Sequence, residues 1–310
     1  MTAPRFRLAM TGASGLLGSA LAAKLGEDGH DVLRLVRRPP QAGEIGWDPV
    51  AGRIDADALE GLDGVIHLAG ENVGTRWTAE RKRRIRESRS RGTRTLTEAL
   101  ARLRRPPRVL LSASGVGVYG NRGEEVLTES SPTLSAPPDF LVEVGREWEA
   151  ATEPARAAGI RVVLLRFGII LDPGGGALAR MVLPFRLGLG GPLGSGRQWM
   201  SWISIGDAVG AVRHALVTET LAGPVNITSP QPVTNRTFSA TLGRVLGRPA
   251  VIPVPAVALK LLLGEMATVA LLGSQRVIPE RLQRSGFEFR HPGLEGALRE
   301  VLGKTLDGSR

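Results

Sequence analysis

Short apolar segments alternate with longer amphipathic segments along the first half of this chain. Continuous apolar runs, which are typical of strands buried in a parallel sheet, lie at residues 6–10, 32–36, 65–69, 109–112 and 162–167. Leu17, Leu21 and Leu25 follow the first run at helical spacing, and two longer stretches predict helices over 78–103 and 140–158. This alternation predicts an α/β fold, in which helices cover both faces of a doubly wound parallel sheet.

The pattern changes beyond residue 172, where glycine and proline interrupt the alternation. Residues 174–176 are all glycine, and residues 188–196 contain further glycines. The run at 225–227 predicts a strand that returns to the sheet. We therefore expect a first domain at residues 1–172 and a smaller, helix-rich C-terminal portion at 173–310 that partly returns strands to the sheet.

Composition and charge exclude several classes of site. The chain has no cysteine, which excludes disulfides and cysteine-ligated metals, and its four histidines are scattered, so we expect no metal site. Lysine and arginine number 40 against 30 acidic residues, and this excess is compatible with a GC-rich coding sequence, with thermal adaptation or with an anionic partner. The densest cationic cluster, residues 81–91, contains no aromatic residue for base stacking, which argues against nucleic-acid binding.

The most apolar stretch does not predict a membrane span. Residues 256–272 are interrupted by Lys260, Gly264 and Glu265, and the stretch is short for a bilayer. The first residues lack the apolar segment of a secretory signal. We expect a cytoplasmic protein without a membrane partner, and nothing in the pattern indicates its oligomeric state.

A glycine motif lies between the first predicted strand and helix. Gly12, Gly15 and Gly18 have the spacing that permits a tight turn, a close approach of backbone N–H groups to a pyrophosphate, and close packing of helix on strand. The N-terminus of the helix adds partial positive charge. The position of the motif at this junction predicts dinucleotide binding.

The end of the second predicted strand indicates which dinucleotide. A site for NAD places an acidic residue there to bind the ribose 2′-hydroxyl, but this chain has Arg37 and Arg38 instead. A guanidinium pairs with a 2′-phosphate, which a carboxylate would repel. We therefore predict NADP(H) as the cofactor, with Arg37 bound to the 2′-phosphate and Arg38 as an auxiliary group.

Further motifs resemble a known superfamily, the extended short-chain dehydrogenases/reductases. The first group of matching segments comprises residues 11–18, 68–72, 88–89, 112–114 and 118–120. A second group is similar to the atypical, epimerase-like branch (NAD-dependent epimerase/dehydratase) and comprises residues 166–168, 188–196, 199–204 and 264–267. The resemblance covers nearly the whole chain.

The resemblance implies a Rossmann-type domain that holds NADP, with the C-terminal portion closing over the nicotinamide. It implies cofactor contacts from Gly12, Ser14, Gly15, Leu16 and Leu17 on the pyrophosphate side, from Leu68 and Ala69 along the adenine ribose, and from Arg37 and Arg89.

The usual catalytic pair of the superfamily is missing. Members that transfer hydride use Tyr-x-x-x-Lys, in which the lysine lowers the pKa of the tyrosine. Tyr119 is the only tyrosine here and Gly123 follows it at that spacing, while Phe140 or Leu141 occupies the expected tyrosine position. Candidates for a replacement proton donor are Ser114, Tyr119 and Glu71.

Three interpretations remain open at this point. The protein is an NADP-dependent oxidoreductase or epimerase-like enzyme with a different proton donor, a non-catalytic NADP(H) sensor or scaffold, or a binder of an anionic polymer. Arg197, Gln198 and Trp199 follow a glycine turn that faces the cleft in this architecture, where arginine could bind an anion and tryptophan a ring. For an enzyme, Arg197 together with Ser114 and Glu71 predicts a small polar or anionic substrate.

Overall fold

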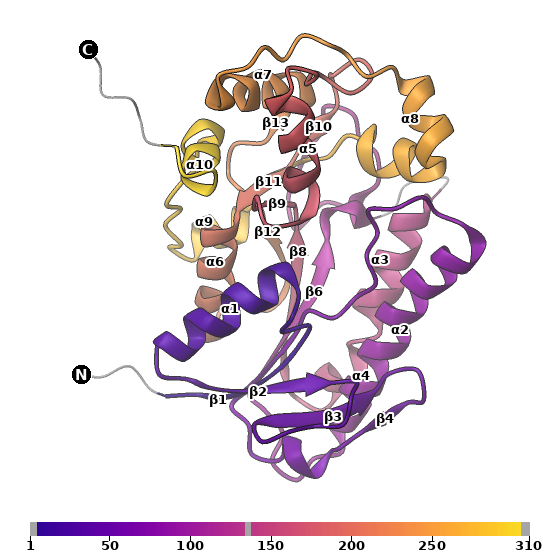
Figure 1. The fold of residues 1–310 in the computed structure, drawn as a ribbon. Coiled ribbons are helices and arrows are strands. Elements are labelled where there is room, and N and C mark those ends of the chain that lie inside the picture. The colour runs from indigo at the N-terminus through magenta and orange to yellow at the C-terminus, as the bar shows by residue number, and fades with distance from the viewer. Residues whose placement is uncertain (1–4, 134–137, 305–310) are drawn as a thin grey trace.

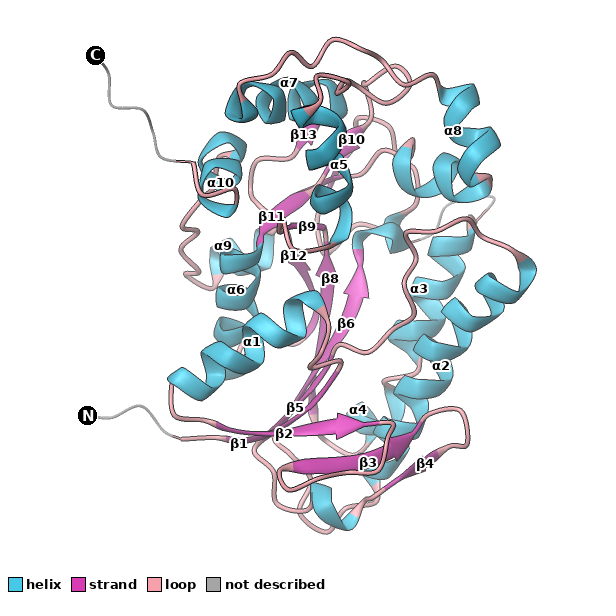
Figure 2. Cartoon of the chain, in the orientation of Figure 1, coloured by secondary structure: helices cyan, strands magenta, loops and turns pink. Residues whose placement is uncertain are grey.

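An eight-stranded sheet forms the centre of the computed structural model, which describes residues 5–133 and 138–304. The strand order is β12-β8-β6-β5-β1-β2-β3-β4, and all pairs are parallel except β3–β4 (Figures 1 and 2). The strands are β1 (Arg7–Thr11), β2 (Asp31–Val36), β3 (Glu44–Asp48), β4 (Arg53–Ile54), β5 (Gly64–His67), β6 (Val109–Gly115), β8 (Arg161–Phe167) and β12 (Gly223–Ile227). The predicted doubly wound α/β fold is confirmed.

Helices cover the two faces of this sheet. On one face lie α1 (Leu16–Glu27) and α6 (Ile205–Val217), and Leu21 of α1 and Val212 of α6 belong to the same buried core as Leu8 of β1. On the other face lie α2 (Ala79–Ala101), α3 (Phe140–Ala150) and α4 (Glu153–Ala157), and Leu96 of α2 packs with Ala9 and Leu110 (Figure 1). Alternate residues of each strand thus face different helices, which explains the continuous apolar runs.

The C-terminal lobe lies at the carboxyl ends of the central strands (Figure 1). Its helices are α5 (Gly176–Arg186), α7 (Asn235–Leu246), α8 (Ala256–Leu263), the short π-helical segment η3 (Ala267–Leu271), α9 (Glu280–Arg284) and α10 (Leu294–Val301). Small two-stranded sheets are formed by β9 (Ile169–Leu171) with β11 (Trp202–Ser204), β10 (Trp199–Met200) with β13 (Val233–Thr234), and β7 (Val126–Leu127) with β14 (Arg276–Val277). Trp202, Phe238, Leu242 and Leu298 belong to a core of its own.

The helix predicted over 140–158 is in fact two helices, α3 and α4. Pro154 lies in the first turn of α4, where its missing N–H costs nothing, but it cannot continue the hydrogen-bond ladder of α3. The hydroxyl of Thr152 donates to the carbonyl of Glu149 (2.7 Å) at the end of α3.

The sequence analysis did not predict β3, β4 or the other strands of two or three residues. The short 3₁₀ segments η1 (Asp57–Leu59) and η2 (Val116–Tyr119) complete the described elements.

Candidate functional site

The loop between β1 and α1 brings backbone close to the carboxyl edge of the sheet. A Cβ on Gly12, whose φ is +69°, would lie 2.8 Å from the carbonyl carbon of Leu68, and a Cβ on Gly18 would lie 2.1 Å from the Gly12 oxygen. Gly15 caps α1 and has no side chain to accept from the first-turn N–H groups. These groups are therefore left for an anion at the N-terminus of the helix.

A buried hydrogen-bond chain supports this loop from below. Thr11 Oγ1 accepts from the backbone N–H groups of Leu68 (3.1 Å) and Ala69 (3.2 Å), so its own proton is directed to His67 Nδ1 (2.7 Å). His67 Nε2 then donates to Thr93 Oγ1 (2.9 Å), which assigns the tautomer from the network. Burial lowers the pKa of His67 to about 4, so the ring is neutral at physiological pH.

One side of the glycine loop opens into a cavity of about 600 Å³, here called the arginine cavity. Its wall includes Ser14, Leu68, Ala69, Arg34, Arg37, Arg38 and Glu44. Arg38 donates to Glu44 (2.6 Å), and the backbone N–H of Gln41, together with Arg38, lowers the pKa of that carboxyl. Arg37 makes no hydrogen bond or ion pair with the residues that the structure describes, so its guanidinium is available to a ligand.

Glu71 belongs to this first cavity and is held by arginines of α2. Its carboxylate pairs with Arg81 and Arg84, and its backbone N–H donates to Ser88 Oγ (3.0 Å). The structure therefore does not bring Glu71 together with Ser114, and the pairing explains part of the cationic cluster on α2.

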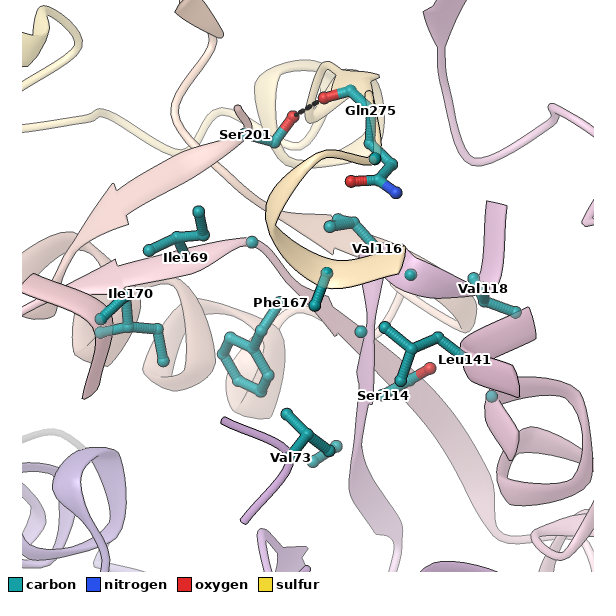
Figure 3. A pocket seen from close by; sticks show the side chains of 18 of the residues that line it. Val73, Ser114, Val116, Val118, Leu141, Phe167, Ile169, Ile170, Ser201 and Gln275 are labelled. Atoms are coloured by element: carbon teal, nitrogen blue, oxygen red, sulfur yellow. Dashed lines mark hydrogen bonds between the residues drawn. The ribbon is translucent and has the colours of Figure 1, made fainter. Parts of the chain in front are cut away.

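The other side of the loop opens into a second cavity of about 460 Å³, here called the apolar cavity (Figure 3). It shares Gly12, Gly15 and Leu68 with the arginine cavity. The apolar side chains of its wall include Leu16, Leu17, Val73, Val116, Leu141, Trp148, Phe167, Ile169, Ile170, Met181, Trp199, Val269 and Leu271. Its polar side chains are Arg89, Ser114, Ser201, Asn235 and Gln275. Both halves of the chain contribute, and two cavities that meet at an anion-binding loop suit a dinucleotide with its pyrophosphate at the junction.

Arg89 reaches the apolar cavity from α2. Its guanidinium donates to the carbonyl of Glu71 (2.9 Å) and lies 4.8 Å from the ring centroid of Trp148. Burial lowers the pKa of Arg89 to about 10, so the group still carries its charge at neutral pH. It thus places a desolvated cation where the two cavities approach each other.

Of the two residues expected at the position of the missing tyrosine, only Leu141 lines the apolar cavity. Leu141 projects into the apolar cavity (Figure 3). Phe140 instead packs edge-on against Trp77, with ring centroids 5.0 Å apart. Gly145, four residues after Leu141, also lines the cavity at the expected lysine position, and a Cβ there would lie 3.0 Å from Val118. Neither position can carry a proton.

Ser114 is the one candidate proton donor that lines the apolar cavity. Its hydroxyl donates to Glu149 (2.7 Å), whose carboxylate forms a bidentate pair with Arg166 (2.7 Å for each bond). Burial by itself lowers the pKa of Arg166, but the bonds and charge of Glu149 outweigh it and raise the pKa above its ordinary value. Because the Ser114 proton is directed to Glu149, the Ser114 oxygen can accept a hydrogen bond from a ligand.

Tyr119 lies in the core rather than in either cavity wall. Its hydroxyl donates to Asn226 (2.8 Å) and accepts from Arg166 (2.9 Å), and burial raises its pKa. The Tyr119 hydroxyl therefore bridges Asn226 of β12 and Arg166 of β8.

Arg197, Gln198 and Trp199, the three residues after the glycine turn, do not line the same cavity. Trp199 lines the apolar cavity, with Arg276 4.2 Å from its ring centroid. Arg197 and Gln198 line a different, shallow pocket, and the Gln198 amide donates to the carbonyls of Leu193 (3.1 Å) and Leu271 (3.2 Å). The polar wall of Ser114, Glu71 and Arg197 that we expected is therefore not assembled.

Sequence reasoning missed Glu44, Glu149 and the residues that η3 adds to the apolar cavity. Glu149 follows Leu141 and Gly145 at four-residue spacing, so helical periodicity could have placed it on the same face. Glu44 lies on a strand that was not predicted. No group of three or more histidine, aspartate or glutamate side chains that could hold a metal ion occurs within residues 5–133 and 138–304.

Comparison with known proteins gives a consistent result across the chain. A model described as the NAD dependent epimerase/dehydratase family matches residues 8–227, and one described as a domain of unknown function (DUF1731) matches residues 254–301. The chain is 44% identical over 293 residues to the epimerase family protein Mb2239 of Mycobacterium bovis, covering 94% of this chain and 96% of that protein.

Two solved structures are also similar over most of the chain. Human epimerase family protein SDR39U1 (isoform 2), crystallised with NADPH, has a TM-score of 0.87 and 35% identity, covering 96% of this chain and all of that one. A nucleoside-diphosphate sugar epimerase from Corynebacterium glutamicum has a TM-score of 0.81 and 36% identity, covering 98% of this chain and 60% of that one. The motifs, the fold and these relatives agree that the chain belongs to the NAD dependent epimerase/dehydratase family.

Proposed function

We propose that this protein binds NADP(H) across the glycine loop, with the adenosine half in the arginine cavity and the nicotinamide half in the apolar cavity. The observation that carries the proposal is that two cavities meet at Gly12 and Gly15, one of them with Arg37 in its wall. The NADPH in the crystal structure of the human relative supports the choice of NADP(H) over NAD(H).

The residues suit the cofactor at each point along its length. The first-turn N–H groups of α1 would bind the pyrophosphate, and Arg37 would pair with the 2′-phosphate, with Arg38 holding Glu44 aside. Leu68 and Ala69 would lie along the ribose, and Leu16 and Leu17 near the phosphates. Bound NADP(H) would supply hydride transfer. The protein itself would have to accept or donate the proton that accompanies the hydride.

We propose an oxidoreductase or epimerase-like activity in which Ser114 takes the place of the missing pair. The Ser114 oxygen would accept the hydroxyl hydrogen of a substrate, and a proton received by Ser114 would be relayed to Glu149 across their 2.7 Å bond. Because the cavity wall is mainly apolar, the substrate that fits is a small alcohol or carbonyl compound with an apolar body. This proposal differs from the polar or anionic substrate expected from the sequence, because Ser114, Glu71 and Arg197 line three different cavities.

A second candidate is a non-catalytic NADP(H) sensor or scaffold. It is favoured by Leu141 and Gly145, which leave the position of the catalytic pair without a titratable group. The enzyme and the sensor or scaffold would both bind NADP(H), but only the enzyme would convert a substrate. Cofactor binding and turnover are therefore tested in separate experiments.

The cofactor is tested by calorimetric titration with NADPH and NADH. The unmodified protein is expected to bind NADPH more tightly, and Arg37→Ala should reduce that preference about tenfold or more, as expected for a charged hydrogen-bonded pair. Arg53→Ala is the matched control, since Arg53 is exposed and outside both cavities. Equal affinity of the unmodified protein for the two cofactors would contradict the proposal.

Turnover is tested with a panel of apolar alcohols and carbonyl compounds, followed by NADPH absorbance. For any compound that is converted, Ser114→Ala should lower kcat by about 10²–10⁴-fold with NADPH affinity kept, and Tyr119→Phe should have a much smaller effect. If tight NADPH binding is accompanied by no turnover across the panel, the sensor or scaffold function replaces the enzyme.

A further inference from the structure

Exposed apolar side chains are concentrated at one end of the C-terminal lobe. Of the eleven large hydrophobic residues that are exposed in the described chain, eight lie in residues 183–189 and 251–262, and we call these eight the apolar patch. Leu261 is 73% exposed, Leu262 69% and Val257 68%, all on α8, where Leu259 provides the buried side. Patches of this kind on a water-exposed surface mark an interaction site more often than scattered single residues do.

The two segments of the patch lie side by side where residues 190–192 meet residues 252–254. The backbone N–H of Ile252 donates to the carbonyl of Gly190 (3.2 Å), and that of Val254 donates to the carbonyl of Pro192 (2.9 Å). Leu187 and Leu189 thus lie beside residues 251–252, which lead directly into α8. In Figure 1, α8 lies at the outer edge of the lobe, where a flat partner could reach it.

The charge around the patch is mainly positive, because Glu265, which follows α8, is paired with Lys82. Residues 173–265 contain eight lysine or arginine residues, of which Arg213 pairs with Asp28 by the amino ends of the strands, and three acidic residues. Asp207 is 2% exposed, and Glu219 lies by the amino ends of the strands, in a groove that it shares with Phe6 and Asp63. Exposed cations border the patch on both sides, since Arg248 donates to the carbonyl of Arg186 (3.0 Å) and Arg76 donates to the carbonyl of Leu261 (3.3 Å).

We infer that the apolar patch docks this protein on the surface of an anionic lipid bilayer, with the leucines of α8 inserted and the bordering cations among the headgroups. Within the described residues, no helix has the length and apolar character needed to cross a bilayer, so the helix would lie in the interface. The aliphatic side chains of the patch suit the acyl region of a bilayer, and the cations that border them suit anionic headgroups. A protein partner would more often meet aromatic residues, and the only aromatic residue of the patch segments, Phe185, is buried. A second copy would bring the same cations face to face.

The inference is tested by co-sedimentation with vesicles of phosphatidylcholine, alone or with about one third phosphatidylglycerol. The full chain should bind the anionic vesicles, and the triple variant Val257→Gln, Leu261→Gln, Leu262→Gln should bind at least about tenfold more weakly. Lys260→Glu should weaken binding to anionic vesicles at low salt more than at high salt. The matched control is Val50→Gln with Val217→Gln, which removes exposed valines away from the patch and should leave binding unchanged.

Thermal unfolding shows whether the variants still fold, which is expected because the replaced side chains are exposed and glutamine is a good helix former. Three results would overturn the inference. One is no binding of the unmodified protein to anionic vesicles. Another is equal binding by the unmodified protein and the triple variant. The third is a concentration-dependent dimer that the triple variant loses without any vesicle binding, which would assign the patch to a second copy.

Discussion

Arg38 and Glu44 form an ion pair in the same cavity wall as Arg37, so in the proposed binding mode this pair would lie beside the 2′-phosphate. The Glu44 carboxylate is neutralised by Arg38 and by the N–H of Gln41. Removing Arg38 would leave a negative charge facing the phosphate. In this proposal Arg38 would influence the choice of cofactor through its ion pair with Glu44.

We predict that Arg38→Ala weakens NADPH binding more than about tenfold and leaves NADH binding nearly unchanged, as an unneutralised carboxylate repels only the 2′-phosphate. The double variant Arg38→Ala, Glu44→Gln should recover most of the lost NADPH affinity. Calorimetry on the two variants and on Glu44→Gln alone completes the cycle. If the two effects on NADPH affinity simply add, Arg38 does not act through Glu44.

The buried His67 makes stability depend on pH. Its pKa is lowered from the ordinary value of 6.5 to about 4, so between these values the unfolded chain binds a proton that the folded chain does not. The free energy of unfolding should therefore fall as pH drops from 6.5 to 4, by about 3 kcal/mol from this group.

Urea unfolding of the unmodified protein and of His67→Gln at several pH values measures this contribution. Burial raises the pKa of Glu129 and Asp139, which affects both proteins alike and cancels in the comparison. The difference in stability between the two proteins should narrow as the pH falls. Parallel pH profiles would show that His67 is protonated as easily in the folded protein as in the unfolded one.

At the scale of elements, α1 depends on the glycines of its first turn and tolerates change further along. Gly18→Ala would force the Gly12 carbonyl to move, because the new Cβ would lie 2.1 Å from its oxygen. We predict a lower melting temperature and NADPH binding at least about tenfold weaker. Gly26→Ala, in the same helix with nothing within 4 Å of its Cβ, should instead stabilise the protein by about 0.5–1 kcal/mol. Similar effects of the two changes on thermal unfolding and NADPH titration would refute this account of the loop.

Most strands of the central sheet could be predicted from the sequence, including the edge strand β12, whereas β3 and β4 near the opposite edge could not. β1, β5, β6 and β8 are continuous apolar runs because helices cover both sides of the sheet. β4 is the edge strand and has only two residues, and β3 beside it has only two buried apolar side chains, Ile45 and Trp47, so neither contains a continuous apolar run. The short strands of the lobe are held by pairing between distant segments, which local patterning does not encode.

Some features of the candidate site could also be predicted from the sequence, and others could not. The glycine motif depends on local backbone geometry, and its predicted position between a strand and a helix is confirmed. Whether Ser114, Glu71 and Tyr119 share one cavity depends on how loops turn after the strand ends, which only the folded chain determines. The choice between Phe140 and Leu141 required the phase of α3 to within one residue.

At the scale of the whole molecule, the two cavities differ in which parts of the chain form them. The wall of the arginine cavity comes entirely from residues 12–88, whereas the apolar cavity is shared between the sheet domain and the lobe, which contributes Met181, Trp199 and Leu271. A ligand that fills both cavities must therefore connect two parts with separate hydrophobic cores. We retain the division near residue 172 as a proposal for where these parts meet.

Hydrogen exchange should distinguish the two halves of the cofactor. NADPH is expected to slow exchange in residues 12–18 and also in α3 and residues 267–275, because opening the apolar cavity would expose the nicotinamide half to water. The 2′-phosphorylated ADP-ribose, which lacks nicotinamide, should protect the glycine loop and residues 34–38 but leave 267–275 nearly unchanged. Helix α10 lines neither cavity and is the internal control. Equal protection of residues 267–275 by both ligands would mean that the lobe responds to the adenosine half alone, and the assignment of the nicotinamide half to the apolar cavity would then fail.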